Sequence, residues 1–394
     1  MAIHRKVYRF RMRPKKAQGQ ALGRMAGARR WVWNWALRRW KDHYAATGES
    51  ISLKQLSAEL TALKSHPETA WLGECDSQAL QQALKDLHRA FVNFFEERAR
   101  SPRFKSRKRD KARFRIPQRV KIEDGKVYVP KVGWIRVRQS REVDGQPKSA
   151  TFRREADGHW YVSLVIEFEM PDVPIPTPTA EETIGIDLGL IDFVTTSNPN
   201  EEPTPAPRFY RKATNKIRRA QRAISRRQKG SKRRQKARKR LARAHQKASR
   251  QRQDFLHKLS TDLVNKHEAI CIEDLNVKGL ARTKLAKSFS DAAMGEFRRQ
   301  LEYKCLWNRK TLVVIDRFFP SSKMCNRCGA LNDRLALSDR EWDCDCGSHH
   351  RRDFLAACNV RDEGLRILAA GQAERLNAQG ASASPGPAGQ LASN

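Results

Sequence analysis

The chain of 394 residues contains 79 Lys and Arg against 43 Asp and Glu, which gives a formal net charge of +36 at pH 7. Its hydrophobic fraction of 39% is sufficient for folded cores and excludes a wholly disordered chain, and no apolar run approaches the ~18 residues of a membrane-spanning helix. Such a positive excess indicates a polyanionic partner, and nucleic acid is the best candidate because each phosphate that Lys or Arg neutralises releases a counterion.

The N-terminal part of the chain is predicted to be a strand followed by helices. Residues 3–13 alternate loosely between apolar and basic side chains, which is typical of a short strand. This terminus lacks the apolar core of a signal peptide, so we expect a cytoplasmic protein. Apolar residues then recur at helical spacing over 17–46 and 52–63 and from Ser77 onward.

From about Arg113 to Glu169 the apolar period changes to two, as in strands. The dipeptides Asp124-Gly125 and Asp157-Gly158 are typical of hairpin turns. The expected strands are 126–129, 134–137, 150–154 and 160–168. They indicate a small β unit, plausibly a barrel, to which the N-terminal strand could also belong, with the helices as an insertion.

A basic loop over 102–109 lies between the predicted helices and strands. It interleaves Phe104 with Arg103, Lys105 and Arg107, the pattern of a surface that follows a nucleic-acid backbone. A solvated linker is the alternative interpretation. Repeated prolines at 171–180 form a stiff second linker and predict a domain boundary.

A carboxylate lies inside an apolar run at the start of the second half. Asp187 sits within residues 183–190, whose apolar residues on both sides of it are typical of a strand covered on both faces. Keeping an isolated carboxylate ionised there would cost several kcal/mol unless a cation or hydrogen-bond donors compensate it. The alternative is a strand-end Asp that caps a turn. Residues 192–196 are expected to form a second strand, hairpinned to the first.

Residues 210–266 are strongly basic and mostly helical, with a break at Gly230. The side chains expected to contact nucleic-acid phosphates here are Lys216, Arg218, Arg219, Lys232, Arg233 and Arg234. A solvated helical face is the usual alternative for such a run, and the density of cations favours phosphate contact. A buried strand at 269–275, a helix near 292–308 and a strand over 311–315 follow.

Four of the eight cysteines are spaced as metal ligands. Cys325 and Cys328 form a C-x-x-C pair, and Cys344 and Cys346 form a C-x-C pair after fifteen intervening residues. Two sulfur pairs on turns can complete a tetrahedral Zn²⁺ site with no open position, so that the metal would be structural. An incidental cluster of cysteines is the alternative. The cysteines expected to be buried free thiols are Cys75, Cys271, Cys305 and Cys358.

Two further acids occur in settings that match Asp187. Glu273 lies near the end of a second buried strand, and Asp353 opens a helix. Carboxylates from two adjacent strand ends and one helix can converge at one sheet edge, and hard divalent cations take oxygen ligands. We therefore expect the three acids to hold catalytic Mg²⁺ or Mn²⁺, since two such ions can clamp the attacking and leaving oxygens in phosphodiester hydrolysis. Acids at strand ends are common, so their spacing alone also allows a structural role.

Several stretches resemble the TnpB (OrfB-type) proteins of bacterial insertion sequences, compact relatives of the type V CRISPR effector nucleases. The matching residues are 185–189, 253–260, 272–275, 295–297, 301–304, 319–322 with Cys325 and Cys328, and 376–378. The resemblance implies an RNA-guided DNA endonuclease of a transposable element, which cuts double-stranded DNA complementary to a guide RNA from its own element. By position, the catalytic acids would be Asp187, Glu273 and Asp353.

The resemblance also implies a multidomain fold of α+β and α/β class. It combines a RuvC-type, RNase H-like nuclease domain, interrupted by a zinc ribbon, with an N-terminal β-barrel wedge that carries an inserted helical recognition domain. The expected domains are 1–15 with 113–170 (wedge), 16–112 (recognition), 171–180 (linker), 181–318 with 348–370 (nuclease), 319–347 (zinc ribbon) and 371–394 (flexible tail). The resemblance further implies that the protein is bacterial, that it acts in the cytoplasm at the nucleoid, and that it has no membrane partner.

One segment departs from the family pattern. Where the family usually has Asp-Arg-Asp-x-Asn-Ala-Ala, this chain keeps Asp353 but has Arg351 and Leu355 at the positions of the first Asp and the Asn. Losses next to a metal site typically cost about 10–100-fold, so a weakened or inactive nuclease that binds DNA as a repressor or regulator is an open alternative. A DNA-strand transferase is a third hypothesis. The sequence does not favour it, because no Tyr-His-His set that could supply the nucleophile of such an enzyme is visible.

Overall fold

A computed structural model describes residues 2–171, 177–280, 282–336 and 338–371, and the chain divides into two compact units, Met1–Asp172 and Val173–Asn394. Part of the expected linker at 171–180 and nearly all of the expected tail at 371–394, including 376–378, lie outside the described residues. Within the described part of the chain, no helix is both long and apolar enough to cross a membrane.

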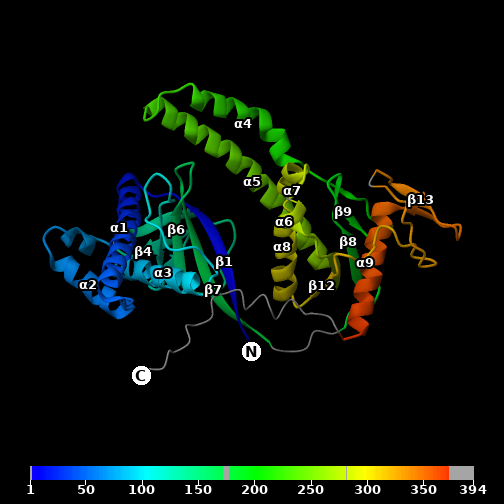
Figure 1. Cartoon of the computed structure of the whole chain (residues 1–394), viewed down its shortest axis with the longest axis horizontal. Coiled ribbons are helices and arrows are strands. Elements are labelled where there is room, and N and C mark those ends of the chain that lie inside the picture. The colour runs from blue at the N-terminus through cyan, green and yellow to red at the C-terminus, as the bar shows by residue number, and fades with distance from the viewer. Residues whose placement is uncertain (1, 172–176, 281, 337, 372–394) are drawn as a thin grey trace. The chain divides into compact units, whose positions relative to one another are not determined.

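The first unit is built on one seven-stranded antiparallel sheet with the order β2-β6-β7-β1-β5-β4-β3 (Figure 1). Its strands are β1 (Ala2–Met12), β2 (Arg113–Ile116), β3 (Lys121–Glu123), β4 (Lys126–Val129), β5 (Gly133–Arg138), β6 (Pro147–Arg154) and β7 (Trp160–Met170). The two predicted hairpin turns join β3 to β4 and β6 to β7. Among the described residues no pairing joins the edge strands β2 and β3, so closure of this sheet into the expected barrel is not confirmed.

The helices of the first unit are inserted between β1 and β2, as predicted. They are α1 (Lys16–Thr47), α2 (Leu53–Ser65), the 3-10 helix η1 (Ala70–Glu74) and α3 (Ser77–Phe95). The apolar stripe predicted for α3 is buried as far as Phe91, whereas Phe94 and Phe95 are exposed. Sheet and helices share a single hydrophobic core, so the insertion is part of the same folded unit.

The second unit contains a five-stranded sheet with the order β10-β9-β8-β11-β12. Its strands are β8 (Thr183–Asp187), β9 (Asp192–Thr196), β10 (Thr204–Pro205), β11 (Ala269–Glu273) and β12 (Thr311–Ile315). β8, β11 and β12 are parallel, and β9 forms the predicted antiparallel hairpin with β8. Parallel strands are normally covered on both faces, which agrees with their continuous apolar runs.

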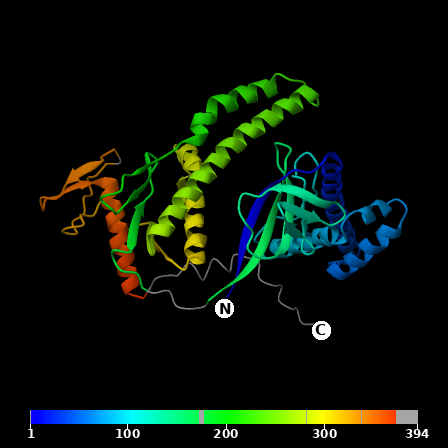
Figure 2. The same ribbon diagram turned by 180° about the vertical axis from the view of Figure 1, so that it is seen from behind.

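Helices cover both faces of this sheet. α9 (Arg352–Ala369) packs on one face, and α5 (Lys232–Lys266) with α8 (Met294–Trp307) packs on the other (Figure 2). Side chains alternate along β11: Ile270 and Ile272 pack with α5 and α8, whereas Cys271 packs with Val360 of α9. The remaining elements are α4 (Phe209–Ser225), α6 (Val277–Leu280), α7 (Ala286–Ala292), β13 (Glu341–Asp343) and β14 (His349–Arg351).

Two glycines allow α9 to lie directly on the sheet. A Cβ atom at Gly185 would clash with the backbone of α9 at Ala357, and one at Gly364 would clash with the Cys271 sulfur. Gly185, which belongs to the motif around Asp187, is therefore needed for close packing. Because side chains alternate along β8, Asp187 lies on the same face as Gly185, the face that α9 covers.

Candidate metal centres and nucleic-acid interface

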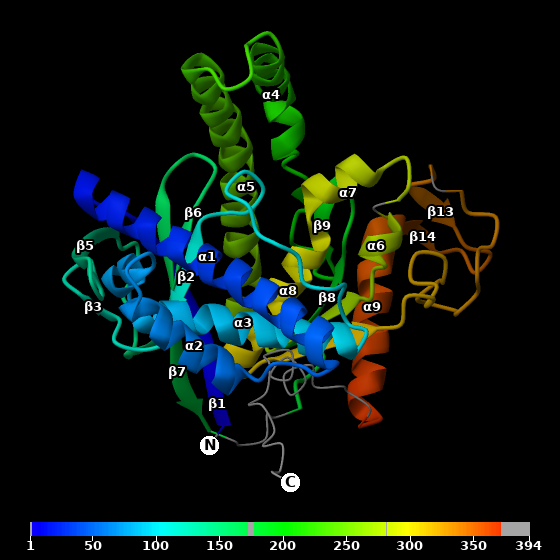
Figure 3. The same ribbon diagram turned by 60° about the vertical axis from the view of Figure 1, so that its left-hand side comes forward.

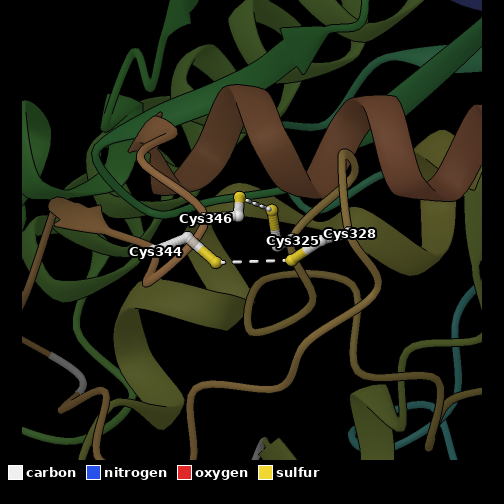
Figure 4. Close-up of side chains that lie close together, drawn as sticks. All are labelled: Cys325, Cys328, Cys344 and Cys346. Carbon is white, nitrogen blue, oxygen red and sulfur yellow. Dashed lines mark hydrogen bonds between the residues drawn. The ribbon is translucent and has the colours of Figure 1, made fainter.

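Four sulfur atoms meet in the segment between β12 and α9. The Sγ atoms of Cys325, Cys328, Cys344 and Cys346 all lie within 4.8 Å of one another. Cys325 is 3.7 Å from Cys346 and Cys328 is 3.5 Å from Cys344, measured between Sγ atoms (Figure 4). A tetrahedron with zinc–sulfur bonds of about 2.3 Å has sulfur–sulfur edges of about 3.8 Å. The cluster therefore fits Zn²⁺ with four protein ligands.

Local turns build this cluster. Gly329 and Gly347 follow the two cysteine pairs with φ of 76° and 83°, which glycine adopts without steric cost. Their N–H groups donate to the carbonyls of Cys325 (2.9 Å) and Cys344 (2.8 Å) and close the two turns. The second pair lies in the turn of the β13–β14 hairpin, which ends at Arg351. The zinc ribbon thus extends past the boundary expected at residue 347.

Neighbouring groups shift the pKa values of these thiols in opposite directions: they raise those of Cys328 and Cys344 and lower that of Cys346. The Ser348 hydroxyl and backbone N–H lower the pKa of the Cys346 thiol to about 6. His350 is buried, and its Nε2 lies 3.1 Å from Cys325 Sγ, so it contacts a ligand from outside the four-sulfur set. Thiolates are the species that binds zinc, so Cys346 is the ligand most readily available, and the spacing of the four sulfurs supports a metal site over an incidental cluster.

The three acids predicted to hold magnesium lie around one edge of the five-stranded sheet. Asp187 is the last residue of β8 and Glu273 is the last residue of β11. The two strands are parallel with Ile186 opposite Ile272, so the next residues in this register are the two acids. Both acids project from the face that α9 covers, and Asp353 is the second residue of α9.

The acids influence one another's protonation. Burial, followed by the negative charges of Glu273 and Asp353, raises the pKa of Asp187 to about 7. Burial also raises the pKa of Glu273, and the hydrogen bond from Ser321 opposes that shift. A bound divalent cation would reverse the balance and favour the ionised carboxylates. The donor set consists of oxygens only and therefore fits a hard cation such as Mg²⁺ or Mn²⁺.

The acids are less tightly gathered than the cysteines. Among the described residues, their oxygens do not form a group within 4.8 Å, as the four sulfurs do. Each carboxylate has a protein donor instead: the Leu188 backbone N–H for Asp187, the Ser321 hydroxyl for Glu273, and Arg340 Nη1 at 3.4 Å for Asp353.

Two residues whose role the sequence did not indicate hold this edge in place. Ser321 is buried and donates its hydroxyl to Glu273. Asn359 of α9 is 2% exposed, and its Nδ2 donates to the carbonyls of Ser321 (2.6 Å) and Met324 (2.7 Å). The loop that leads into Cys325 is therefore fastened to α9 and also positions Glu273. Its only signal in the sequence was that it resembles the family at 319–322.

The two departures from the family pattern belong to the zinc ribbon. Arg351 is exposed in β14 and lies opposite Glu341 of β13. Leu355 is 2% exposed and packs with Cys325 and Trp342. Leu355 thus faces the ribbon, whereas Asp353 is a helical neighbour of Ala357, which packs on the sheet.

The predicted phosphate-contacting residues of the second half lie on a helical hairpin of α4 and α5 (Figure 3). The exposed members of the set are Lys216, Arg218, Arg219, Lys232 and Arg233. Arg234 is half-buried and donates to the Arg227 carbonyl at 2.7 Å, so it closes the turn between the helices. Gly230, in that turn, has a φ of 89°. The hairpin presents a cationic surface suited to phosphates.

The basic loop at 102–109 is fastened to α1. Asn34 exchanges two hydrogen bonds of 2.8 Å with the backbone of Lys105, and Trp33 Nε1 donates to the Arg103 carbonyl at 3.1 Å. The loop is therefore anchored to α1 at Arg103 and Lys105, while Arg103, Phe104 and Arg107 are exposed, so both interpretations stay open.

The cations of this loop differ in their surroundings. Arg103 pairs with Asp110 at 2.8 Å. Lys105 Nζ lies 2.8 Å from the centroid of the Trp33 ring, and burial lowers its pKa to about 7. Arg107 is exposed. Of the three cations, Arg107 is thus the most accessible to a phosphate.

Three family models match this chain. They are described as OrfB of the IS605 type, "Probable transposase" (residues 163–284), "Cas12f1-like, TNB domain" (residues 295–360) and the OrfB-type "Helix-turn-helix domain" (residues 1–49). The described part of 1–49 holds one strand, β1, and one continuous helix, α1, so the structure shows no helix-turn-helix there.

Similar proteins align over most of the chain. "Putative RNA-guided DNA endonuclease" of Streptomyces pristinaespiralis is 40% identical over 376 residues, which cover 94% of this chain and 92% of the relative. "Putative RNA-guided DNA endonuclease InsQ" of Escherichia coli (strain K12) is 34% identical over 386 residues, which cover 93% and 94%. The solved "Cas12f1-sgRNA-target DNA complex" aligns over 91% of this chain and 99% of that chain with 11% identity. Its TM-score is 0.48, from which no conclusion follows.

Proposed function

Because the chain belongs to the OrfB (TnpB) family of insertion-sequence proteins, whose relatives are named as RNA-guided DNA endonucleases, we propose that it cuts DNA complementary to a bound guide RNA. The reaction would be phosphodiester hydrolysis at Asp187, Glu273 and Asp353. The observation that carries this assignment is that the three acids come from two adjacent strand ends and the first turn of α9, close enough for Glu273 and Asp353 to raise the pKa of Asp187 beyond the effect of its burial.

The second unit would be a RuvC-type, RNase H-like nuclease domain, with the zinc ribbon inserted between β12 and α9. A mixed sheet covered on both faces supports this, since ligands of such sheets bind at the carboxyl ends of the parallel strands. The first unit would be the wedge, with α1 to α3 as its recognition helices.

The three acids would hold Mg²⁺ or Mn²⁺, which supplies, when bound, an activated water and a clamp for the leaving oxygen. The chain itself positions the ligands. Ser321 would fix Glu273, and Arg340 would neutralise part of the charge on Asp353. Without a metal, Asp187 is half ionised at a pH of about 7. The four cysteines would hold Zn²⁺ with no open position, so zinc would support the fold only.

The cationic hairpin of α4 and α5 would contact RNA or DNA phosphates, and Arg107 would add a contact from the first unit. Neutralised phosphates make such binding strongly salt-dependent. The relatives above come from bacteria, and a DNA substrate would place the protein in the bacterial cytoplasm, at the nucleoid.

The test begins with expression of the gene together with its flanking DNA. RNA that copurifies with the protein is sequenced. Plasmids that carry the matching sequence are then incubated with Mg²⁺ and the RNA-bound protein, here called the particle. We expect cutting, and we expect Asp187→Asn to lower its rate by about 10³-fold or more, because a metal ion contributes several kcal/mol to the transition state. RNA and target binding should persist in this variant.

The matched control is Asp333→Asn, which removes an exposed carboxylate of the same unit and should cut at the wild-type rate. Undiminished cutting by Asp187→Asn would disprove the assignment of the acids. Guided binding without cutting, in Mg²⁺ and in Mn²⁺, would identify the protein as a regulator of the same architecture.

A further inference from the structure

A cavity of about 330 Å³ lies beside the acids, within the second unit. Its walls come from the turn after β8, from the residues that precede and open α4, and from α7. Leu190, three residues after Asp187, lines it, and so does Arg340, which pairs with Asp353 at 3.4 Å. The three acids do not line the cavity themselves, so Leu190 and Arg340 are the residues that link it to the proposed catalytic edge.

Much of the wall is apolar. Leu190, Pro207 and Ala292 contribute to it, and two large aliphatic side chains stand at it with much of their surface exposed: Ile191 (52%) and Leu285 (54%). Tyr210 adds an aromatic ring. Single exposed aliphatic residues are ordinary, but several around one concave volume suit a flat, largely apolar ligand group.

The charged groups at this cavity are mainly cations: Arg208, Arg211, Lys287 and Arg340. Asp291 is the one acid that lines it among the described residues, and its carboxylate already accepts from the backbone N–H groups of Tyr210 (2.9 Å) and Arg211 (3.1 Å). Those bonds cap the start of α4, and Arg252 lies 3.9 Å from the same carboxylate. The remaining charge favours an anionic ligand.

We propose that this cavity holds one unpaired base of the DNA strand that is being cut, with the adjoining phosphate on the side of Arg340. The inference rests on the proposed nuclease function and specifies its substrate. Bases stack on aromatic and apolar side chains while cations track the backbone, and the cavity combines both kinds of group. A base that is stacked inside a duplex cannot enter, so the strand is single or the nucleotide is flipped at this point.

The experiment uses the full-length RNA-bound particle and single-stranded DNA that matches the guide. One base at a time around the cut is replaced by an abasic residue, and the cleavage rate is measured. We expect one position next to the cut phosphate to be about 10-fold more sensitive than its neighbours, since loss of one stacked base has an effect of this size. Uniform rates at all positions would overturn the proposal.

Leu285→Asp tests the cavity from the protein side. Leu285 is the N-cap residue of α7, where Asp is well tolerated, so the variant should fold. It should cut the intact strand about 10-fold more slowly and lose the sensitivity to the abasic residue, because the two changes remove the same contact. Retained sensitivity would contradict the proposal.

Leu331→Asp is the matched control, since Leu331 is also 54% exposed but lies in the zinc ribbon, outside the cavity. It should keep both the wild-type rate and the abasic sensitivity. If the wild-type RNA-bound protein cuts nothing, the nuclease proposal fails. The affinity of the protein for each abasic DNA strand is then measured in Ca²⁺ in place of the cleavage rate. A position-specific loss that Leu285→Asp abolishes would then still support the cavity, and its absence would overturn it.

Discussion

Two sets of candidate metal ligands lie near α9, and they are assembled in different ways. The sulfur set comes from residues 325 to 346, and two glycine turns bring its members together. The carboxylate set comes from positions 187, 273 and 353, and it depends on strand register and on the packing of α9 against Gly185. The sulfur set is thus encoded locally, whereas the carboxylate set requires the whole second unit to fold.

Electrostatics separates the two sets as well. Hydrogen bonds from Ser348 lower the pKa of Cys346 to about 6. The hydrogen bond from the Cys346 backbone N–H lowers the pKa of Cys344, but burial and the neighbouring thiols outweigh it and raise that pKa to about 12. Burial and mutual repulsion raise the pKa of Asp187 to about 7, so the acids resist ionisation until a cation compensates them. The sulfur set thus contains one thiol that ionises readily without a metal, whereas Asp187 in the carboxylate set is only half ionised at a pH of about 7.

The largest expected effect follows from breaking the sulfur set. Cys325→Ser should abolish zinc retention, because structural zinc contributes about 10–16 kcal/mol of apparent binding free energy that is also folding free energy. The ribbon should unfold, and cutting should be lost because the same loop carries Ser321. Metal analysis and thermal unfolding measure the change.

The control for that variant is Cys358→Ala, at a buried thiol of α9 outside the sulfur set. It should retain zinc. If Cys325→Ser itself keeps zinc, then His350, 3.1 Å from this sulfur, has taken over as a ligand, and the assignment of four cysteines is wrong.

The carboxylate set should make the stability of the protein depend on pH. The folded pKa of Asp187, about 7, lies above the unfolded value of ~3.9. The folded state therefore binds more protons between these values, and its free energy of unfolding should fall by up to a few kcal/mol as pH rises from about 4 to about 7. Denaturant titrations in Mg²⁺-free buffer that retains zinc measure this slope.

Asp187→Asn should flatten that slope, because an amide does not titrate. Added Mg²⁺ should stabilise the wild-type protein more at pH 8 than at pH 5, since protons no longer compete for the carboxylates. An unchanged slope in Asp187→Asn would show that another group is responsible.

The same contrast explains what the sequence could predict. The C-x-x-C and C-x-C pairs, the hairpin at Asp157-Gly158 and the helix break at Gly230 depend on short-range chemistry, and the structure contains all of them. The strands β2 and β3 were missed because they are only 4 and 3 residues long and carry few apolar residues. Closure of the first sheet depends on long-range pairing, for which the sequence has no local signal, so the predicted barrel stays a prediction.

The sequence could suggest the three acids as candidates, because each lies within or at the start of an apolar run. It could not suggest Ser321 and Asn359, the residues that hold this edge of the sheet in place. Ser321 reaches Glu273 across 48 positions, and Asn359 reaches Ser321 across 38. Nothing in the periodicity around Ser321 or Asn359 reveals those contacts, because they exist only once α9 lies on the sheet.

Ser321→Ala tests the link between the two sets. Loss of the hydroxyl should lower cutting by about 10–100-fold, as is typical when the support of a metal ligand is removed. The Mg²⁺ concentration needed for half-maximal cutting should rise, a readout that a merely structural role would not move. Zinc content should stay at the wild-type level.

Ser321→Thr keeps the hydroxyl and should recover much of the activity, and Ser338→Ala, at an exposed serine of the same ribbon, should have no effect. Equal loss in Ser321→Thr and Ser321→Ala would indicate that the packing of the loop, and not its hydrogen bond to Glu273, sets the rate.

The smallest effect is expected from Arg351→Asp, which restores the acidic residue typical of the family. Arg351 is exposed and belongs to the sulfur side of α9, where Glu341 lies opposite it. A second acid there would add weak like-charge repulsion, and surface substitutions usually change stability by less than about 0.5 kcal/mol. We therefore expect cutting to change by less than about 2-fold, measured on the matched plasmid. A 10-fold gain in cutting would show that this position acts on the carboxylates after all, and that the wild-type chain is a weakened nuclease because it carries arginine there.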